Sequence, residues 1–354
     1  MSRRGLTFVF AGVALVILVV LASVLPVPYI ILVPGPVTDT LGTVPGTSTP
    51  VVSVEGAKTY PTSGHVYLTT VGVLPASCSN HPTLLQALKA WFNNTQAVEP
   101  HQVQCPPGEP SAKVQQQNEQ DMSNSQRDAI TAALLHLGYK PKTEQVIVGQ
   151  TTDGSPAAKV LAADDAILDI NGKPVTGIVS VHNLIGAVKP GHSLSMTIER
   201  NGTNKDVQVG TYESTDGTHR TLIGVTLSVR ATFDTPHVKI GIDPAQVGGP
   251  SAGLAFALGI VDELTPGDLT GGKTIAVTGT IDALGNVGPI GGIQQKIAGA
   301  KDNGATVFLA PASECADAKA AAPSSMTVVK VSTLSGALDA LAAITSGSTS
   351  YPRC

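Results

Sequence analysis

The longest run of apolar residues lies near the start of the chain. Residues 6–25 read LTFVFAGVALVILVVLASVL, and after Arg4 the next charged residue is Asp39. A helix rises about 1.5 Å per residue, so this run is long enough to cross a hydrocarbon layer about 30 Å thick. The pattern predicts a transmembrane helix over 6–26 that follows a tail of residues 1–5.

The basic residues around this run predict its orientation. Arg3 and Arg4 precede it and the first lysine after it is Lys58, so the positive-inside rule places the tail in the cytoplasm. We therefore expect a single-pass protein of the cell membrane, with residues 27 onward outside the cytoplasm. The alternative is a cleaved signal peptide, because Val20-Leu21-Ala22 fits a cleavage site, although a signal h-region usually has only about 7–15 residues.

The next part, residues 27–145, is predicted to be an N-terminal extracytoplasmic region. Its β-like apolar runs are 29–33, 51–54 and 66–73. Helical periodicity covers 83–92 and 124–138. Between these helices, residues 94–122 are polar and rich in Gln and Pro, and we expect a loop there.

Residues 146–210 form a second predicted unit, with two hairpins that turn at Asn171-Gly172 and Asn201-Gly202. The turn GSPA at 154–157, the hairpin ILDINGKPV, a helix and the closing hairpin follow one another as in PDZ domains of bacterial proteases, which this unit resembles. The relatives' Gly-Asp step is missing at 162–165. The resemblance implies capture of an extended peptide by strand addition, and the alternative is a spacer domain that binds nothing.

The third predicted unit covers residues 219–345 and intermixes strands with helices. Its helix-like segments begin with the very apolar SAGLAFALGIVDEL, and its strands include TIAVTG and TVFLAP. The order has no strict βαβ rhythm, so we predict an α+β fold for this unit.

Two familiar motifs occur in this unit without the neighbouring elements or residues that their functions need. Residues 267–274 fit the phosphate-binding loop G-x4-G-K-[ST], but an apolar helix precedes them and a strand follows, which reverses the order that such a loop needs. Residues 249–253 fit the nucleophile elbow G-x-S-x-G, whose family needs a histidine downstream of the serine. The last histidine of the chain is His237, so a nucleophilic Ser251 would most simply need another base.

A lysine made neutral by burial is the plausible base. On the helix that starts near residue 292, Ile293, Ile297 and Ala300 form an apolar stripe, and Lys296 falls beside it. Lys301 borders the other edge of the stripe, so periodicity alone does not choose between the two lysines.

Residues 248–300 carry a close resemblance to the proteolytic domain of Lon-type serine peptidases. The signature GxIxxxGxVxPIGGxxxK runs from Gly279 to Lys296, after a PSAG segment that contains Ser251. The resemblance implies Ser251 as nucleophile, Lys296 as base and Thr278 as the hydroxyl that helps hold the lysine. Gly248 departs from the pattern, because many ATP-dependent members have an acidic residue there.

The composition of the chain indicates which classes of partner it is not expected to bind. The chain has 354 residues, 14% of them charged, and a net charge of −4, so a basic surface for nucleic acid is not expected. The cysteines show no zinc-site spacing, and we expect no metal and no cofactor. Outside the cytoplasm, their number favours two disulfides, and proximity favours Cys78 with Cys105 and Cys315 with Cys354; buried free thiols are the alternative.

The order of an anchor, a PDZ-like unit and a Lon-type domain without an ATPase module resembles bacterial membrane-anchored Lon-like proteases. This resemblance implies an ATP-independent serine endopeptidase with a Ser-Lys dyad, which acts on protein or peptide substrates. It also implies a homo-oligomer, because Lon-type domains commonly assemble into rings. The alternative function is a PDZ scaffold or chaperone whose Lon-like domain is inactive.

Overall fold

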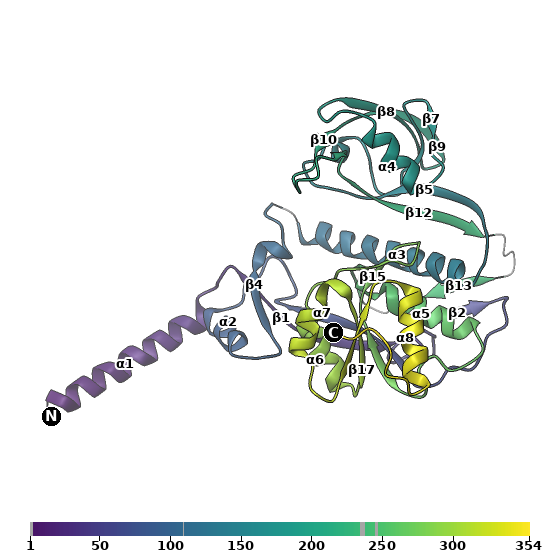
Figure 1. The fold of residues 1–354 in the computed structure, drawn as a ribbon. Helices are drawn as coiled ribbons and strands as arrows, with labels where there is room; N and C mark the ends of the chain where they lie inside the picture. Colours follow the sequence, from purple (N-terminus) through teal and green to yellow (C-terminus); the bar gives the residue numbers. More distant parts are fainter. Residues whose placement is uncertain (1–2, 109, 234–237, 245–246) are drawn as a thin grey trace.

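The computed structural model describes residues 3–108, 110–233, 238–244 and 247–354. A helix projects from the body at the N-terminal end, and a small β-rich domain lies on the other side of a long helix from the body (Figure 1). Helices and strands are intermixed, as the α+β prediction requires.

The projecting helix is α1, Arg3–Val24. Its segment Thr7–Val24 has a mean hydropathy of 2.8, and none of it is buried inside the protein. The helix is therefore long and apolar enough to cross a membrane, and a signal sequence would have the same properties.

The body is built on a six-stranded sheet that combines early and late parts of the chain. The strand order is β18-β17-β14-β3-β1-β4. The strands are β1 Tyr29–Asp39, β3 His65–Leu74, β4 Ala97–Pro100, β14 Thr274–Val277, β17 Val307–Pro311 and β18 Thr327–Val331. β14 pairs in parallel with β3 and with β17, whereas β1 is antiparallel to β3 and β4. The strands of the predicted 27–145 region thus lie in one sheet with those of the third unit.

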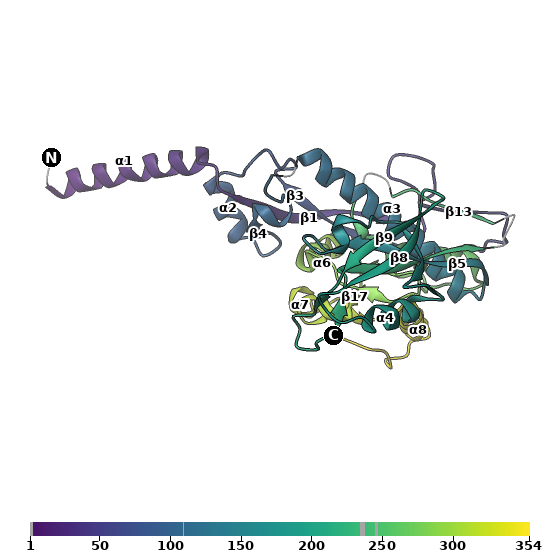
Figure 2. The ribbon, with the colours of Figure 1, turned by 90° about the horizontal axis from the view of Figure 1, so that it is seen from above.

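Helices cover both faces of this sheet (Figure 1), and Figure 2 shows in a view from above how α1 projects from the body. On one face, Ile275 and Val277 pack in a core with α3 (Ser111–His136), α5 (Gly253–Leu264) and α8 (Leu334–Thr345). On the other face, Ala276 and Phe308 pack against α6 (Ile293–Asp302) and α7 (Cys315–Ala321). The alternation along β14 follows from the two-residue period of a strand, because both faces are buried.

The loop predicted over 94–122 was wrong in part. Residues 97–100 are strand β4 and residues 101–103 a short 3-10 helix, and α3 begins at Ser111. The first turns of α3 are largely exposed, so no apolar periodicity marks them, whereas glutamine itself is a good helix former.

The β-rich domain has the strand order β12-β5-β6-β8-β9, with a short β7 beside β6. Its elements are β5 Pro141–Thr151, β6 Ala166–Ile170, β7 Lys173–Pro174, α4 Ile178–Gly186, β8 Ser193–Arg200, β9 Thr203–Gly210, β10 Tyr212–Glu213, β11 Thr221–Leu222 and β12 Val225–Phe233. Asn171 and Gly172 have φ of 52° and 75°, the positive values that a type I′ hairpin turn needs. Strand β12 falls within the predicted third unit, 219–345, and it pairs with β5 in this sheet.

Shorter elements connect these parts. They are α2 Leu84–Trp91, the pair β2 Val52–Glu55 and β13 Lys239–Ile242, the pair β15 Thr280–Ile281 and β16 Val287–Gly288, and the 3-10 helices η1 His101–Val103, η2 Ala157–Lys159, η3 Pro250–Ala252 and η4 Ala312–Glu314.

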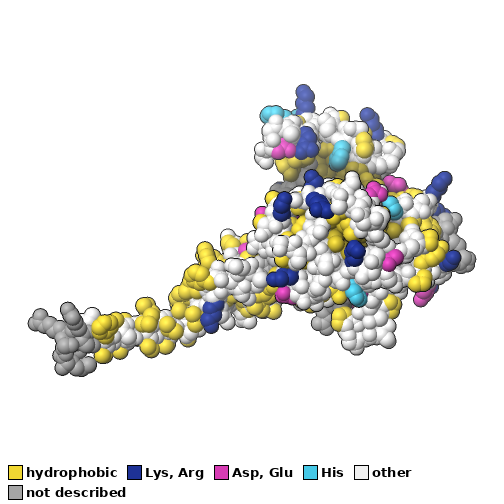
Figure 3. All heavy atoms as spheres, turned by 60° about the horizontal axis from the view of Figure 1, so that its bottom comes forward, with side chains coloured by type: hydrophobic (Ala, Val, Ile, Leu, Met, Phe, Trp, Pro, Cys, Tyr) yellow, Lys and Arg dark blue, Asp and Glu magenta, His cyan; other side chains and the backbone are white. Residues whose placement is uncertain are grey.

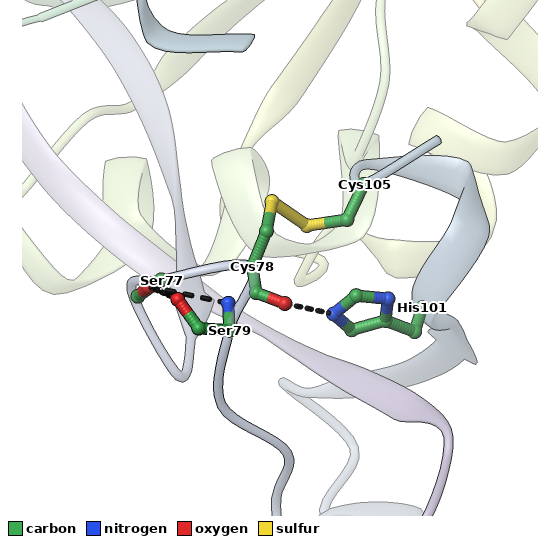
Figure 4. The surroundings of a disulfide bond; sticks show 5 residues. All are labelled: Ser77, Cys78, Ser79, His101 and Cys105. Carbon is green, nitrogen blue, oxygen red and sulfur yellow. Dashed lines mark hydrogen bonds between the residues drawn. A yellow bond between two sulfur atoms is a disulfide. The ribbon is translucent and has the colours of Figure 1, made fainter. Parts of the chain in front are cut away.

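Both predicted disulfides are present. Cys78 is bonded to Cys105, and Cys315 to Cys354. The ring nitrogen Nε2 of His101 lies 3.1 Å from the carbonyl oxygen of Cys78, so the segment after β4 is held to the segment after β3 at two points (Figure 4).

Polar contacts join the β-rich domain to α3. Arg127 donates to Asp164 over 2.7 Å, Gln150 donates to Asp121 over 2.8 Å, and Ser228 donates to Asp128 over 3.1 Å. Burial raises the pKa of Asp128 to about 6 against the opposing effect of Arg127. The face of α3 that meets the domain is therefore polar, whereas its opposite face is part of the core of the body.

Candidate active site

Ser251 lies in η3, directly before the first turn of α5. Gly249 has a φ of 84°, a left-handed value that glycine adopts without strain, and it starts the turn that presents the serine. Helix α3 holds this turn, because Gly249 N donates to Asn118 O over 3.0 Å and Ser125 Oγ donates to Pro250 O over 2.9 Å.

Lys296 lies in α6, one turn after Gly292. Gly292 has a φ of 67°, and a Cβ there would come within 2.6 Å of Val71 Cγ2 in β3, so only glycine fits this approach of helix to sheet. Ile293, Ile297 and Ala300 pack against the sheet, and Lys296 is only 2% exposed. Lys301, the other lysine that periodicity offered, is exposed.

The lysine amine meets three oxygens. Its Nζ lies 2.7 Å from Ser251 Oγ, 3.0 Å from Thr278 Oγ1 and 3.1 Å from Thr69 O. None of the described residues places a carboxylate oxygen within 4.0 Å of Nζ. Burial without a compensating charge lowers the pKa of Lys296 to about 7. A substantial fraction of this amine is then neutral near pH 7.

An open cleft of about 900 Å³ leads to these groups. Ser251 and Lys296 lie in its wall, and Glu99 and Val103 line it at the side of β4. Its volume falls within the range of roughly 300–1,000 Å³ that ligand pockets have.

The structure brings Ser251, Lys296 and Thr278 together, but sequence reasoning missed the groups contributed by the first part of the chain. Thr69 contributes a backbone carbonyl, which every residue has, so no residue type could signal it. Asn118 also contributes a carbonyl, and it falls in the stretch that was expected to be a loop. Ser125 lies in the predicted helix 124–138, but nothing in the sequence indicated its hydrogen bond to the carbonyl of Pro250.

The phosphate-loop motif lies elsewhere, in the turn between α5 and β14. The Asp268 carboxylate accepts hydrogen bonds from the amides of Thr270 and Gly271, groups that a phosphate loop would offer to its ligand. The Lys273 side chain is exposed. The turn interpretation of this motif agrees with these contacts.

Comparison with protein families supports both resemblances. Residues 120–211 match the PDZ domain family, and residues 224–343 match the family described as Lon protease (S16) C-terminal proteolytic domain. The chain therefore combines a PDZ domain with the proteolytic domain of Lon-type serine peptidases. Each match covers less than half of the chain.

Individual relatives match over short segments. A Lon protease of Rickettsia bellii is 35% identical over 106 residues, which is 29% of this chain and 13% of that protein. A probable periplasmic serine endoprotease, DegP-like, of Pseudomonas fulva is 37% identical over 83 residues, 23% of this chain and 17% of that protein. Among solved structures, the PDZ domain of an SdrC-like protein of Listeria monocytogenes is 26% identical with a TM-score of 0.23, covering 25% of this chain and 92% of that one. The chain thus matches less than one fifth of the length of these two curated relatives.

Proposed function

We propose that this protein is an ATP-independent serine endopeptidase that uses Ser251 as nucleophile and Lys296 as general base. The observation that carries the proposal is the 2.7 Å approach of the buried Lys296 amine to Ser251 Oγ. A lysine can accept a proton only when it is neutral, and burial without a carboxylate partner provides that condition.

The proposed reaction has two stages. Neutral Lys296 takes the proton of Ser251 as Oγ attacks the peptide carbonyl, and the resulting ammonium then gives a proton to the leaving amine. Water, activated by the same lysine, hydrolyses the acyl-enzyme and releases Ser251. Backbone N–H groups around Ser251, at the start of α5, stabilise the oxyanion.

Thr278 and Thr69 hold the lysine rather than react. Thr278 is fully buried, and its hydroxyl oxygen lies 3.0 Å from Nζ, while the carbonyl of Thr69 lies 3.1 Å away. These two oxygens point the amine at Ser251 in either protonation state. They also compensate part of the desolvation of the ammonium that forms during attack.

We further propose that α1 anchors the protein in the membrane with the folded part outside the cytoplasm. Arg3 and Arg4 at the start of α1 favour that orientation, and two disulfides favour an oxidising compartment. The similarity to an endoprotease named as periplasmic is consistent with it. Two further points stay predictions: the domain boundaries, which are 146–210 for the PDZ-like unit and 219–345 for the third unit, and the assembly of a homo-oligomer.

The PDZ domain offers a groove for the peptide. A cavity of about 510 Å³ lies between α4 and the segment that enters β12, with His182, Ile185 and Leu222 among its lining residues. Among the described residues β12 is an edge strand of its sheet, and an edge strand can accept an added strand. We propose that an extended segment of the substrate pairs with β12 in this groove.

The direct test is cleavage of an unfolded protein by the purified full chain, with and without ATP. We expect cleavage that ATP does not change and that Ser251→Ala abolishes, together with covalent labelling of Ser251 by a fluorophosphonate. A protein that binds unfolded chains but neither cleaves them nor takes the label would instead be a scaffold or chaperone. Cleavage that rises with ATP and is lost in Lys273→Ala would show that the phosphate-loop motif functions.

A further inference from the structure

Helix α2 exposes large apolar side chains close to the end of α1. Leu88, Trp91 and Phe92 are 44%, 73% and 84% exposed, although they follow one another at helical spacing. Ala87 and Ala90 of the same helix are buried. Trp91 is the one tryptophan in the chain. Large apolar side chains exposed next to one another are a feature of contact surfaces.

Backbone hydrogen bonds fix the start of α2 to the end of α1. Leu84 N donates to Leu25 O over 2.9 Å, and Val27 N donates to Pro82 O over 3.0 Å. Figure 1 shows α2 beside the C-terminal end of α1, and in Figure 3 the apolar surface of α1 continues onto the adjoining part of the body. If α1 spans a bilayer, α2 therefore lies at the outer surface of that bilayer.

The chain segment that contains α2 carries few charges, which also suits a lipid surface, although Glu99 follows it in β4. Residues 66–98 contain a single charged side chain, Lys89, and no aspartate or glutamate. No acidic group in this stretch would be repelled by lipid phosphates, and the one cation would be attracted to them. Tryptophan is enriched at the interface between lipid and water, where its ring is amphipathic.

We propose that Leu88, Trp91 and Phe92 insert into the outer interface of the membrane that α1 crosses. This proposal rests on the membrane anchor given under the proposed function. A second copy of the chain is a poorer occupant, because two side chains on an eight-residue helix and one at its C-cap offer far less than the roughly 800 Å² per partner of a stable interface. β4 follows α2 and lines the catalytic cleft, so this contact holds one wall of the cleft at the membrane surface.

The sole tryptophan makes the test direct. The full chain is reconstituted into phosphatidylcholine and phosphatidylglycerol vesicles, and Trp91 fluorescence is measured with lipids brominated near the glycerol end of the acyl chain and with aqueous iodide. We expect brominated lipid to reduce the emission roughly two-fold and iodide to have little effect, as for an interfacial ring. Leu88→Ser combined with Phe92→Ser should move Trp91 toward water, whereas Asn94→Ser should not.

A second variant separates this proposal from the anchor. In Trp91→Phe combined with Leu15→Trp, the new fluorophore reports on the middle of α1 and should be quenched by lipids brominated near the chain end. If that signal appears while Trp91 of the unaltered chain is quenched by iodide alone, the α2 contact is refuted and the anchor stands. If iodide quenches both, the anchor and the α2 contact fail together. Protection of Trp91 from both quenchers would mean that protein covers it, and would also refute the membrane contact.

Discussion

The two sheets of this protein are assembled over very different distances along the chain. The PDZ sheet uses only residues between Pro141 and Phe233, although its last strand, β12, pairs with its first, β5. The sheet of the proteolytic domain pairs His65 in β3 with Thr274 in β14, across the whole PDZ domain. The PDZ domain is thus inserted between the two parts of the chain that form the sheet of the body. Helix α3 contacts both the PDZ domain and the body. Contacts at smaller sequence separation form faster, so we expect the PDZ sheet to form before the sheet of the body, which needs strands from both ends of the chain.

The proposed catalytic groups depend on this long-range assembly. Ser251, Thr278 and Lys296 come from the later half, but the early half supplies the Thr69 carbonyl and the contacts of α3 to the turn before Ser251. The PDZ groove, in contrast, is lined entirely by its own domain. We therefore expect changes in the body to alter the rate of peptide cleavage, and changes in the PDZ domain to alter which substrates are cleaved.

The largest expected effect is the loss of the base. Lys296→Arg keeps the charge but cannot deprotonate, so we expect turnover to fall about 100- to 10,000-fold, the usual contribution of a general base. Lys301→Arg, on the same helix but exposed, is the matched control and should stay near normal. Steady-state cleavage of a short peptide measures both. Normal turnover in Lys296→Arg, or its loss in Lys301→Arg, would show that the base was assigned to the wrong residue.

The disulfide near the C-terminus should separate the stabilities of the two domains. Cys315→Ser combined with Cys354→Ser removes a crosslink over a sequence separation of 39 residues, which should destabilise the proteolytic domain by about 2–4 kcal/mol. Differential scanning calorimetry should show a lower transition for that domain and an unchanged one for the PDZ domain. An equal decrease in both transitions would mean that they unfold as one unit.

The buried Asp128 predicts a pH effect at the contact between α3 and the PDZ domain. Its folded-state pKa of about 6 lies above the 3.8 of a free aspartate, so the folded protein binds more protons between these values. Stability is therefore lost as the pH rises from about 4 to about 6. Asp128→Asn should raise the free energy of unfolding by up to about 3 kcal/mol at pH 8 and change little at pH 4. Urea titrations at both pH values test this, and an equal effect at both would contradict it.

The smallest expected effect concerns substrate choice. Gly186 lines the PDZ groove and has open space where a Cβ would lie, so Gly186→Trp should fill the groove without disturbing the domain. We expect cleavage of a protein substrate to fall about 10-fold through loss of the second binding site, with peptide cleavage unchanged. Ala187→Trp, an exposed neighbour that does not line the groove, is the control. An equal loss of protein and peptide cleavage would mean that the PDZ domain supports the structure of the proteolytic domain instead of binding substrate.

The same contrast explains what could be predicted from the sequence. The Asn171-Gly172 hairpin is a local signal, and it was confirmed. The motifs around Ser251 and Lys296 are also local, and the resemblance to Lon-type peptidases named both residues; their roles are proposals. The partners of β12 and the carbonyl of Thr69 are set by strand pairing and by backbone atoms, which leave no mark in residue types. The exposed start of α3 had no apolar period to reveal it.

The central claim is that a neutral Lys296 activates Ser251, and the pH dependence of fluorophosphonate labelling tests it most directly. The rate of labelling of Ser251 should rise with pH and level off, with a midpoint near the lowered pKa of about 7. Lys296→Met should label far more slowly and without this midpoint. A rate that stays constant across that pH range, or an unchanged rate in Lys296→Met, would contradict the claim.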